Sequence, residues 1–491
     1  MANYVMLQGT SSHVGKSILT TALCRIFFQE GLRVVPFKAQ NMALNSYVTA
    51  NGLEMGRAQV AQAEAAMLPP NVDMNPVLLK PTGNSTSQVI INGRPISNMS
   101  AKEYHQGYSL KAFEAVKAAL RRLDETFEMI VIEGAGSPAE VNLKANDIVN
   151  MRVAKYLNAP VLLVADIDRG GSLAALVGTL ELLDDDERDL VKGLVINKFR
   201  GDVSLFTPAI DFLEKKTGKP VLGVIPFIDK LGIDDEDSVS LDDKHDTNLK
   251  GEIKVAIIRT PKISNFTDFD SLAGEIDVNL FYATKIEELD TVDLVIIPGS
   301  KNTSEDLIYL QRSGIAERIK TLVKSGVAVI GICGGFQMLG DKVYDPLHIE
   351  SDNDEVDGLH LLPLTTTFAA EKFTRQVMLD SIEFEFLGSR IIGKEIEGYE
   401  IHSGLTETYG ISKVISRENV MGTYIHGIFD NDDFRRQIIN AIRIKKSLNP
   451  IPNTRNVRAE KQRNYERLAK IVRENLNMEL LNSIIANNKM F

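Results

Sequence analysis

Two short stretches of the chain contain residue types that can do chemistry, and the first is GTSSHVGKS at residues 9–17. In such a loop the glycines let backbone N–H groups face phosphate oxygens, the lysine reaches the outer phosphates, and the last hydroxyl can bind Mg²⁺. The common loop has four residues between its glycines, whereas five lie between Gly9 and Gly15. An ordinary glycine-rich turn is the alternative. The pattern favours an ATP site that consists of Gly9, Thr10, Gly15, Lys16, Ser17 and Lys38.

A second group for the metal is expected at the end of a later strand. In EMIVIEGAGSPAE, Glu133 ends an apolar run beside a glycine-rich turn, where a carboxylate is hard to explain by packing. Carboxylate and hydroxyl oxygens suit Mg²⁺. We predict a Mg²⁺ site made by Ser17 and Glu133, with a solvated strand end as the alternative.

Polar residues also follow other apolar runs, in PFKAQNMALNS, LLKPTGNSTSQVIINGR and ADIDRGGS. In an open α/β sheet the ligand crevice lies at the carboxyl ends of the strands. Each of these stretches could equally be a surface loop. We predict that the substrate contacts Gln40, Asn41, Asn45, Lys80 and Asp166.

The second chemical stretch is VAVIGICGGFQMLG, which ends an apolar run with G-x-C-x-G. A sharp turn from strand to helix needs small neighbours and exposes the nucleophile, here Cys333. The start of the helix favours the thiolate, and the N–H of Gly334 is placed for an oxyanion. The alternative is a buried structural cysteine. For the base we favour His426 in GTYIHGIFD, with His402 in GYEIHSG as its competitor.

These stretches must be positioned by parallel sheets, because apolar runs alternate with helical patterns along the chain. The predicted fold class is α/β, with two α/β domains and a helical tail packed on the second domain. Residues 234–251 are acidic and polar and are expected to be a linker or exposed connection, with an acidic loop near a metal site as the alternative. The predicted divisions are a first domain at 1–233, the linker, a second domain at 252–435 and the tail at 436–491.

The composition excludes several classes of protein. The 491 residues are 44% hydrophobic and 25% charged, with a net charge of −11, so nucleic acid is an unexpected partner. Two cysteines allow no disulfide framework or zinc spacing. We find no pattern of an export signal or membrane helix, and we expect a cytoplasmic protein with no membrane partner. The oligomeric state is left open.

Both chemical stretches resemble known families. The longer phosphate loop resembles dethiobiotin synthetase and its relatives, which implies transfer of the γ-phosphate to a carboxylate or its carbamate. The cysteine turn, IIPGSKN and YIHG resemble triad-type glutamine amidotransferases, whose fold is flavodoxin-like. That resemblance implies a thioester on Cys333, with His426 as base and acid. It also implies an oxyanion hole at Gly299, Ser300 and Gly334.

One position departs from the amidotransferase pattern. That family usually has Glu two residues after the histidine, and here the position is Ile428. Either a backbone carbonyl or another carboxylate, such as Glu400 or Asp430, orients His426, or the site works as a dyad.

The fused order and the stretches QNMALNS, MGRAQVAQAEAA, EGAGSPAE, ISNFTDFD and YEIHSG resemble the cobyric acid synthase family of the cobalamin pathway. The resemblance implies amidation of the b, d, e and g carboxylates of adenosylcobyrinic acid a,c-diamide, a corrinoid, with glutamine, ATP and Mg²⁺. One alternative is cobyrinic acid a,c-diamide synthase. Another, from a different class, is a P-loop regulatory ATPase with an inactive amidotransferase as a binding module.

Overall fold

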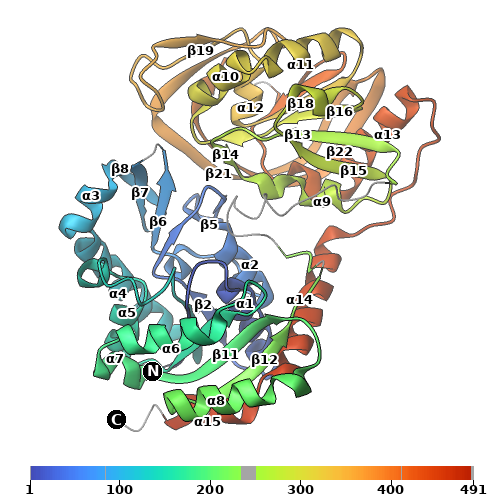
Figure 1. The fold of residues 1–491 in the computed structure, drawn as a ribbon. Helices are drawn as coiled ribbons and strands as arrows, with labels where there is room; N and C mark the ends of the chain where they lie inside the picture. The colour runs from blue at the N-terminus through green and yellow to red at the C-terminus, as the bar shows by residue number, and fades with distance from the viewer. Residues whose placement is uncertain are drawn as a thin grey trace.

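A computed structural model describes residues 2–82, 85–229, 231–233, 250–407, 409–410 and 412–487. Most of the predicted linker at 234–251 lies outside these residues. Two α/β bodies lie one above the other, and the C-terminal helices return from the upper to the lower one (Figure 1). Within the described residues, none of the helices is long and apolar enough to cross a membrane.

The lower body is built on a six-stranded sheet in which each described pair is parallel. Its strands are nearly continuous runs of Val, Ile and Leu, because helices cover both faces. The strand order is β12 (Val221–Pro226), β11 (Val191–Phe199), β10 (Val161–Asp166), β1 (Asn3–Gly9), β9 (Met129–Glu133) and β2 (Val34–Phe37). The main helices are α1 (Lys16–Gln29), α2 (Arg57–Ala65), α4 (Ser109–Thr126), α5 (Met151–Leu157), α6 (Ser172–Leu182), α7 (Asp185–Leu190) and α8 (Thr207–Thr217).

Between β2 and β9 the chain forms an insertion that we did not predict as strands. It rises from the lower body toward the upper one (Figure 1). Its short strands carry polar residues, so the apolar signal that marks the main sheet is weak here. The insertion consists of a sheet of β3 (Gln40–Met42), β6 (Val77–Pro81), β7 (Thr86–Ile91) and β8 (Arg94–Ser100), the hairpin of β4 (Ser46–Val48) and β5 (Glu54–Gly56), and the short helix α3 (Ala101–Glu103).

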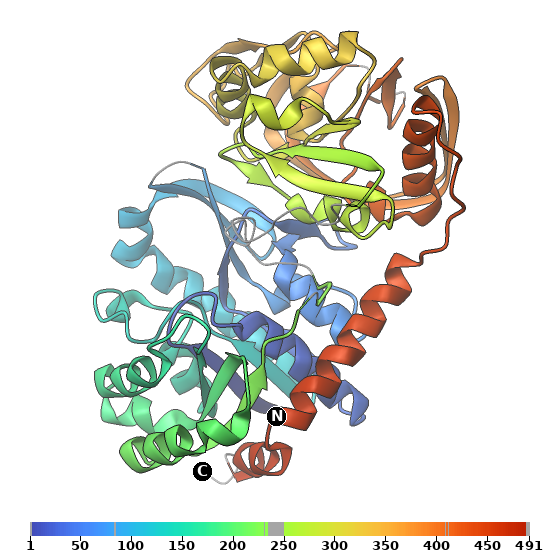
Figure 2. The ribbon, with the colours of Figure 1, turned by 45° about the vertical axis from the view of Figure 1, so that its right-hand side comes forward.

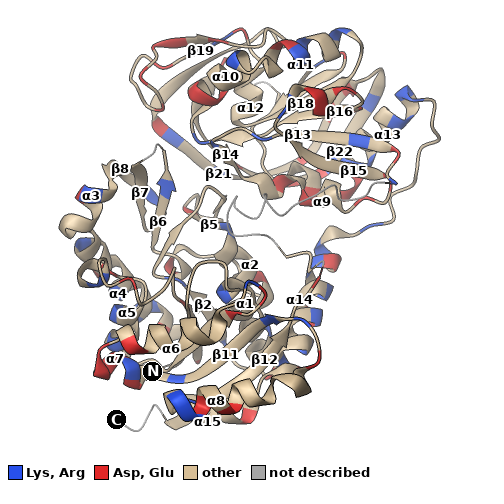
Figure 3. Ribbon diagram, viewed as in Figure 1, with Lys and Arg blue, Asp and Glu red and all other residues tan. Residues whose placement is uncertain are grey.

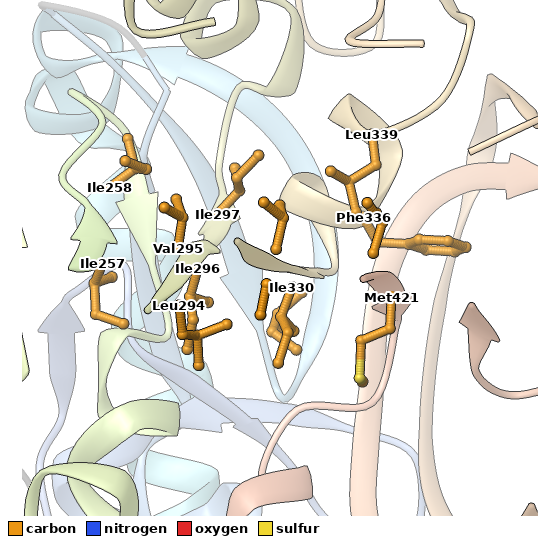
Figure 4. Packing of buried hydrophobic residues seen from close by; sticks show 14 of the residues in the cluster. Ile257, Ile258, Leu294, Val295, Ile296, Ile297, Ile330, Phe336, Leu339 and Met421 are labelled. Carbon is orange, nitrogen blue, oxygen red and sulfur yellow. The ribbon is translucent and has the colours of Figure 1, made fainter. Parts of the chain in front are cut away.

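The upper body has a second six-stranded sheet, parallel except for its edge strand β23. Its buried core includes Ile257, Ile296, Ile330 and Phe336 (Figure 4). The strand order is β15 (Val278–Ala283), β13 (Ile253–Ile258), β16 (Leu294–Ile297), β18 (Ala328–Ile332), β24 (Val420–Thr423) and β23 (Ile415–Arg417). Its helices are α9 (Asp270–Ala273), α10 (Thr303–Arg312), α11 (Ile315–Lys324), α12 (Gly334–Met338) and α13 (Asp432–Lys445). The prediction of mainly parallel α/β folds is confirmed.

A long antiparallel hairpin extends this second body. Its strands are joined by Leu387 and Gly388, which both have positive φ (54° and 73°), as a tight hairpin turn requires. The hairpin reaches the first body, since Thr374 Oγ1 donates to the carbonyl of Gly52 at 2.7 Å. The strands here are β21 (Thr365–Phe386) and β22 (Ser389–Thr406), with β19 (Lys342–Tyr344) and β20 (Glu355–Asp357) beside them and the pair β14 (Ile263–Ser264) and β17 (Gly299–Ser300) near the main sheet.

The position that we predicted for the helical tail is wrong. Helices α14 (Val457–Asn475) and α15 (Met478–Asn487) pack on the first body, not the second (Figure 2). Tyr465, Leu468 and Val472 are buried in one core cluster with the apolar side of α1. A helix buries its apolar stripe wherever a matching surface exists, and α1 and β12 offer that surface. Figure 3 shows Lys and Arg mixed with Asp and Glu along α14.

Of the predicted domain boundaries, the one at residue 435 falls inside α13, which packs against the second body as a whole. The other boundaries stay predictions.

Candidate active site

The predicted phosphate loop connects β1 to α1. Gly15 lies at φ 98°, and a Cβ there would come within 2.1 Å of Asn197 Nδ2, so only glycine fits. The Lys16 ammonium donates to the carbonyls of Ser11 (3.0 Å) and Gly136 (3.1 Å). It thus lies across the loop, where a phosphate-binding lysine is needed.

The buried carboxylate of Glu133 ties the loop to the neighbouring strand ends. Its Oε1 accepts from Ser17 Oγ (2.8 Å) and Lys38 Nζ (2.7 Å), and its Oε2 accepts from Gln62 Nε2 (2.5 Å). The structure therefore brings together Ser17, Lys38 and Glu133, which the sequence predicted separately. Gln62 was missed, because it lies inside helix α2, where no strand end marks it.

The residues present fit a Mg²⁺ ion. Ser17 Oγ and Glu133 Oε1 are adjacent hard oxygen ligands, and Mg²⁺ typically takes one or two protein oxygens and completes its shell with phosphates and water. Within the described residues no group of three or more His, Cys, Asp or Glu side chains is arranged to hold a metal.

The other residues that we predicted for ATP or substrate have varied surroundings. The Thr10 N–H donates to the carbonyl of Val164 (2.9 Å). The hydroxyl of Thr10 is not part of this bond and could contact a ligand. Asn41 Nδ2 donates to Gln59 Oε1 (2.9 Å). Asp166 forms an ion pair with Lys198 (2.8 Å). None of these contacts tests the predicted roles, which stay predictions.

Gln40 lies in a cavity beside the phosphate loop. The cavity has a volume of about 480 Å³ and is also lined by Gly136, whose carbonyl accepts from Lys16. Gln40 Oε1 accepts from the Tyr104 hydroxyl at 2.5 Å. Met42 (54% exposed) and Leu143 (40% exposed) present apolar surface at the same cavity.

Asn45 and Lys80 have surroundings that include the second body. Asn45 Oδ1 accepts from the backbone N–H of Phe266 (3.1 Å), which belongs to the second body. Lys80 lines a small cavity that also holds Cys333 and His426. Both residues therefore lie at the junction of the two bodies.

Cys333 occupies the sharp turn between β18 and α12. Its φ of 51° and ψ of −109° are strained for a residue with a Cβ. A Cβ on Gly335 would come within 1.9 Å of the Ile297 carbonyl, so the turn requires small residues. The Cys333 thiol donates to the carbonyl of Ile401 at 3.5 Å. This is the geometry predicted for a nucleophile.

His426 is oriented by Asp268, a residue that we did not single out. His426 Nδ1 lies 2.6 Å from Asp268 Oδ2, and the other carboxylate oxygen accepts from the Gly427 N–H at 3.0 Å. Burial alone would lower the pKa of His426, but the charges of Asp268 and Cys333 outweigh it and raise the pKa to about 10. His426 therefore has a carboxylate partner, which favours a triad over the dyad alternative, and the catalytic roles stay predictions.

The two carboxylates proposed as orienters have other partners. Glu400 accepts from Arg375 (2.6 Å), Tyr409 (2.7 Å) and Lys413 (3.2 Å). Asp430 accepts from the Ser271 hydroxyl. Asp268 lies in the stretch ISNFTDFD, between Phe266 and Phe269, but it stands 158 residues before the histidine, so no local pattern connects the two.

His402, the competing candidate for the base, lines the small cavity that contains Cys333 and His426. Its ring stacks on Tyr424 with centroids 3.7 Å apart. Its Nδ1 donates to the carbonyl of Gly404 at 2.8 Å. Burial lowers the pKa of His402 to about 4, so the ring is neutral near pH 7.

The predicted oxyanion elements lie next to the thiol turn. A Cβ on Gly334 would come within 2.9 Å of the Ser300 nitrogen, and one on Gly299 would come within 3.3 Å of His426 Cε1. Since the Ser300 hydroxyl donates to Asp306 Oδ2 (2.6 Å), Ser300 can serve an oxyanion through its backbone. The roles of Gly299, Ser300 and Gly334 stay predictions that this proximity supports.

Comparisons with known proteins agree with both centres. The CobQ/CobB/MinD/ParA nucleotide binding domain matches residues 5–240, and the CobB/CobQ-like glutamine amidotransferase domain matches residues 254–434. The cobyric acid synthase of Pelotomaculum thermopropionicum is 51% identical over 99% of this chain and 97% of its own length.

The cobyric acid synthase of Moorella thermoacetica is 51% identical over 99% of this chain and 98% of its own length. The cobyric acid synthase of Carboxydothermus hydrogenoformans is 50% identical over 99% of this chain and 100% of its own length. The chain belongs to the cobyric acid synthase family. It is an amidoligase with a nucleotide-binding domain and a glutamine amidotransferase domain.

Proposed function

We propose that this enzyme uses ATP and glutamine to amidate the b, d, e and g carboxylates of adenosylcobyrinic acid a,c-diamide, which yields adenosylcobyric acid. The observation that carries the proposal is the presence of two intact centres on one chain. One joins Lys16, Ser17 and Glu133 at a phosphate loop, and the other joins Cys333 and His426 to Asp268. The cobyric acid synthases that are about 50% identical to this chain support the substrate.

The phosphate centre activates the acid. A carboxylate oxygen of the substrate attacks the γ-phosphorus of ATP, the bond to ADP breaks, and an acyl phosphate forms. Lys16 stabilises the charge on the outer phosphates. Ser17 and Glu133 would hold Mg²⁺, which neutralises phosphate charge when bound.

The thiol centre supplies the nitrogen. The Cys333 thiolate attacks the side-chain amide carbon of glutamine, and His426 gives its proton to the departing ammonia. Water then hydrolyses the thioester to glutamate. The free ammonia attacks the acyl phosphate, phosphate leaves, and one amide is formed for each ATP.

The cavity beside the phosphate loop suits a corrinoid. Its apolar surface at Met42 and Leu143 can pack against a flat macrocycle. Lys144 and Lys155 on its wall form ion pairs with Glu187 (2.7 and 3.4 Å), so a peripheral carboxylate of the substrate would share these cations with Glu187. Gln40, for which the sequence predicted a substrate contact, lines the same cavity.

Mass spectrometry tests the proposal directly. The enzyme is incubated with the corrinoid diamide, Mg-ATP and either glutamine or an ammonium salt. Since each exchange of OH for NH₂ lowers the mass by about one unit, four steps lower it by about four. Cobyrinic acid is the control substrate. Amidation of cobyrinic acid at a and c alone would favour the a,c-diamide synthase, and ATP hydrolysis without any mass change would favour a regulatory ATPase.

A further inference from the structure

The small cavity at Cys333 carries more charge than the three catalytic residues explain. Its wall includes the lysines Lys80, Lys301 and Lys372 and one carboxylate, Glu350. Lys80 comes from β6 of the first body, whereas the other three come from the second. The cavity is therefore closed by both bodies together.

Lys301 is a lysine on the wall of this cavity. Within the part of the chain that the structure describes, its ammonium makes no hydrogen bond or ion pair. Burial lowers the pKa of Lys301, and the charge of Glu350 acts in the opposite direction. A half-buried ammonium without a partner is unfavourable, so an anionic ligand in this cavity would be bound with a gain in free energy.

Lys80 has one donor left for a ligand. Its Nζ donates to Ser46 Oγ (2.9 Å) and to Glu54 Oε1 (2.8 Å). The second oxygen of Glu54 accepts from Lys372 at 2.6 Å, across the junction between the bodies. An ammonium has three N–H groups, and the one that Lys80 does not use for these partners is available at the cavity wall.

Glutamine carries an α-carboxylate and an α-ammonium, and the cavity offers a complement for each. Glu350 supplies the negative charge and accepts from the Thr303 N–H through one oxygen, at 2.9 Å. His402 Nε2 is buried without a partner within the described residues, and it lines the same cavity. Because His402 carries its proton on Nδ1, its Nε2 is an acceptor.

We propose that Lys301, together with Lys80 from the first body, binds the α-carboxylate of glutamine, and that Glu350 binds its α-ammonium. This inference rests on the proposed function, which makes glutamine the nitrogen source. It adds that the first body completes the glutamine site, so that glutamine is recognised only when the two bodies are docked.

Truncated substrates test each contact. 4-Aminobutanamide is glutamine without the α-carboxylate, and glutaramate is glutamine without the α-ammonium. For Lys301→Met we expect kcat/KM for glutamine to fall about 10- to 150-fold, the range for one charge-assisted hydrogen bond. The value for 4-aminobutanamide should stay nearly unchanged, because that substrate has no carboxylate to lose. Lys80→Met should behave in the same way with a smaller fall.

Glu350→Gln gives the complementary result. It should lower kcat/KM for glutamine and for 4-aminobutanamide alike, and it should leave glutaramate nearly unchanged. Lys324→Met, at an exposed lysine of α11, is the matched control and should behave as the wild type. Equal losses for glutamine and 4-aminobutanamide in Lys301→Met would overturn the role of Lys301. Where Lys301→Met does not fold, Lys301→Gln makes the same measurement.

The proposed function and the inference about glutamine recognition are contradicted by different results. If the wild type forms no amide from the corrinoid diamide with ATP and ammonium salt, the proposed function is wrong. If it does so, but Lys301→Met and Lys80→Met both keep the wild-type preference for glutamine over 4-aminobutanamide, only the inference about recognition is wrong.

Discussion

The two chemical centres differ in how they are assembled. The phosphate centre is built within one body, and its charges meet each other there, since Glu133 binds Lys38, Ser17 and Gln62 directly. The thiol centre combines a strained turn, a histidine and a distant aspartate, and its cavity also takes Lys80 from the other body. The comparison indicates that ATP chemistry depends on one fold, whereas glutamine chemistry depends on the docking of two.

The largest effects are expected for substitutions of Cys333 and Lys16, because the thiol centre supplies ammonia and the phosphate centre activates the carboxylate. Cys333→Ala should reduce glutamine-dependent amidation by at least about 10⁴-fold, because no thioester can form. It should still amidate with ammonium salt at raised pH, where free NH₃ is abundant. Lys16→Ala should lose both reactions, because neither nitrogen source attacks an unactivated carboxylate.

Product formation measured by mass spectrometry with each nitrogen source distinguishes the outcomes. Rescue of Lys16→Ala by ammonia, or a folded Cys333→Ala that ammonia does not rescue, would break the division of labour between the centres. Circular dichroism of both variants controls for folding.

A somewhat smaller effect is expected at the third member of the thiol centre. Asp268→Asn should lower the glutaminase rate about 10²- to 10⁴-fold, because an amide can hold the imidazole in the wrong tautomer and cannot stabilise its charge. Ammonia-dependent amidation should persist. Glu400→Gln is the matched control, since Glu400 has its own ion pair with Arg375. A larger loss in Glu400→Gln than in Asp268→Asn would contradict the triad.

The comparison also explains what the sequence could predict. Gly15, Lys16 and Ser17 are contiguous, and Glu133 ends a strand beside them, so the strand pattern was enough to bring them together. Asp268 belongs to a short 3₁₀ turn with no periodic signal, and only the packing of that turn against His426 gives it a role. Contacts between residues that are far apart in the sequence leave no mark in local sequence patterns.

The same reason applies to the fold. Runs of Val, Ile and Leu predicted the parallel sheets, because buried strands need such runs. The hairpin of β21 and β22 was not predicted, since its outer face is polar along much of its length. The helical character of α14 was visible in its sequence, but an apolar stripe does not say which surface will cover it.

Because α14 packs on the first body, a substitution in this helix should destabilise that body. Leu468 is fully buried against α1, and Leu468→Ala should lower the free energy of unfolding by about 2 to 5 kcal/mol through lost burial and a cavity. Hydrogen exchange should quicken in α1 and β12 and stay unchanged in β13. Lys470→Ala, at an exposed position of the same helix, is the control. Faster exchange in β13 instead would place the tail on the second body.

The smallest effect that we predict concerns the two cavity histidines, which should respond to pH in opposite directions. Burial lowers the pKa of His402 to about 4, whereas an unfolded histidine titrates near 6.5. Its contribution to stability is therefore present above about pH 6.5 and is lost as the pH falls toward 4. The pKa of His426 is raised to about 10, so its contribution is present below about pH 6.5 and is lost as the pH rises toward 10.

Urea unfolding followed by circular dichroism from pH 4 to 9 measures this difference. His402→Phe keeps an aromatic ring between Tyr424 and Phe373 but cannot be protonated. Relative to the wild type, it should gain about 2 kcal/mol of stability between pH 6.5 and pH 4, because the wild type alone must keep a histidine neutral there. Parallel pH profiles for the two proteins would show that His402 is not held neutral by burial. In that case its Nε2 would not be the acceptor that completes the glutamine cavity, and Glu350 alone would have to balance the α-ammonium.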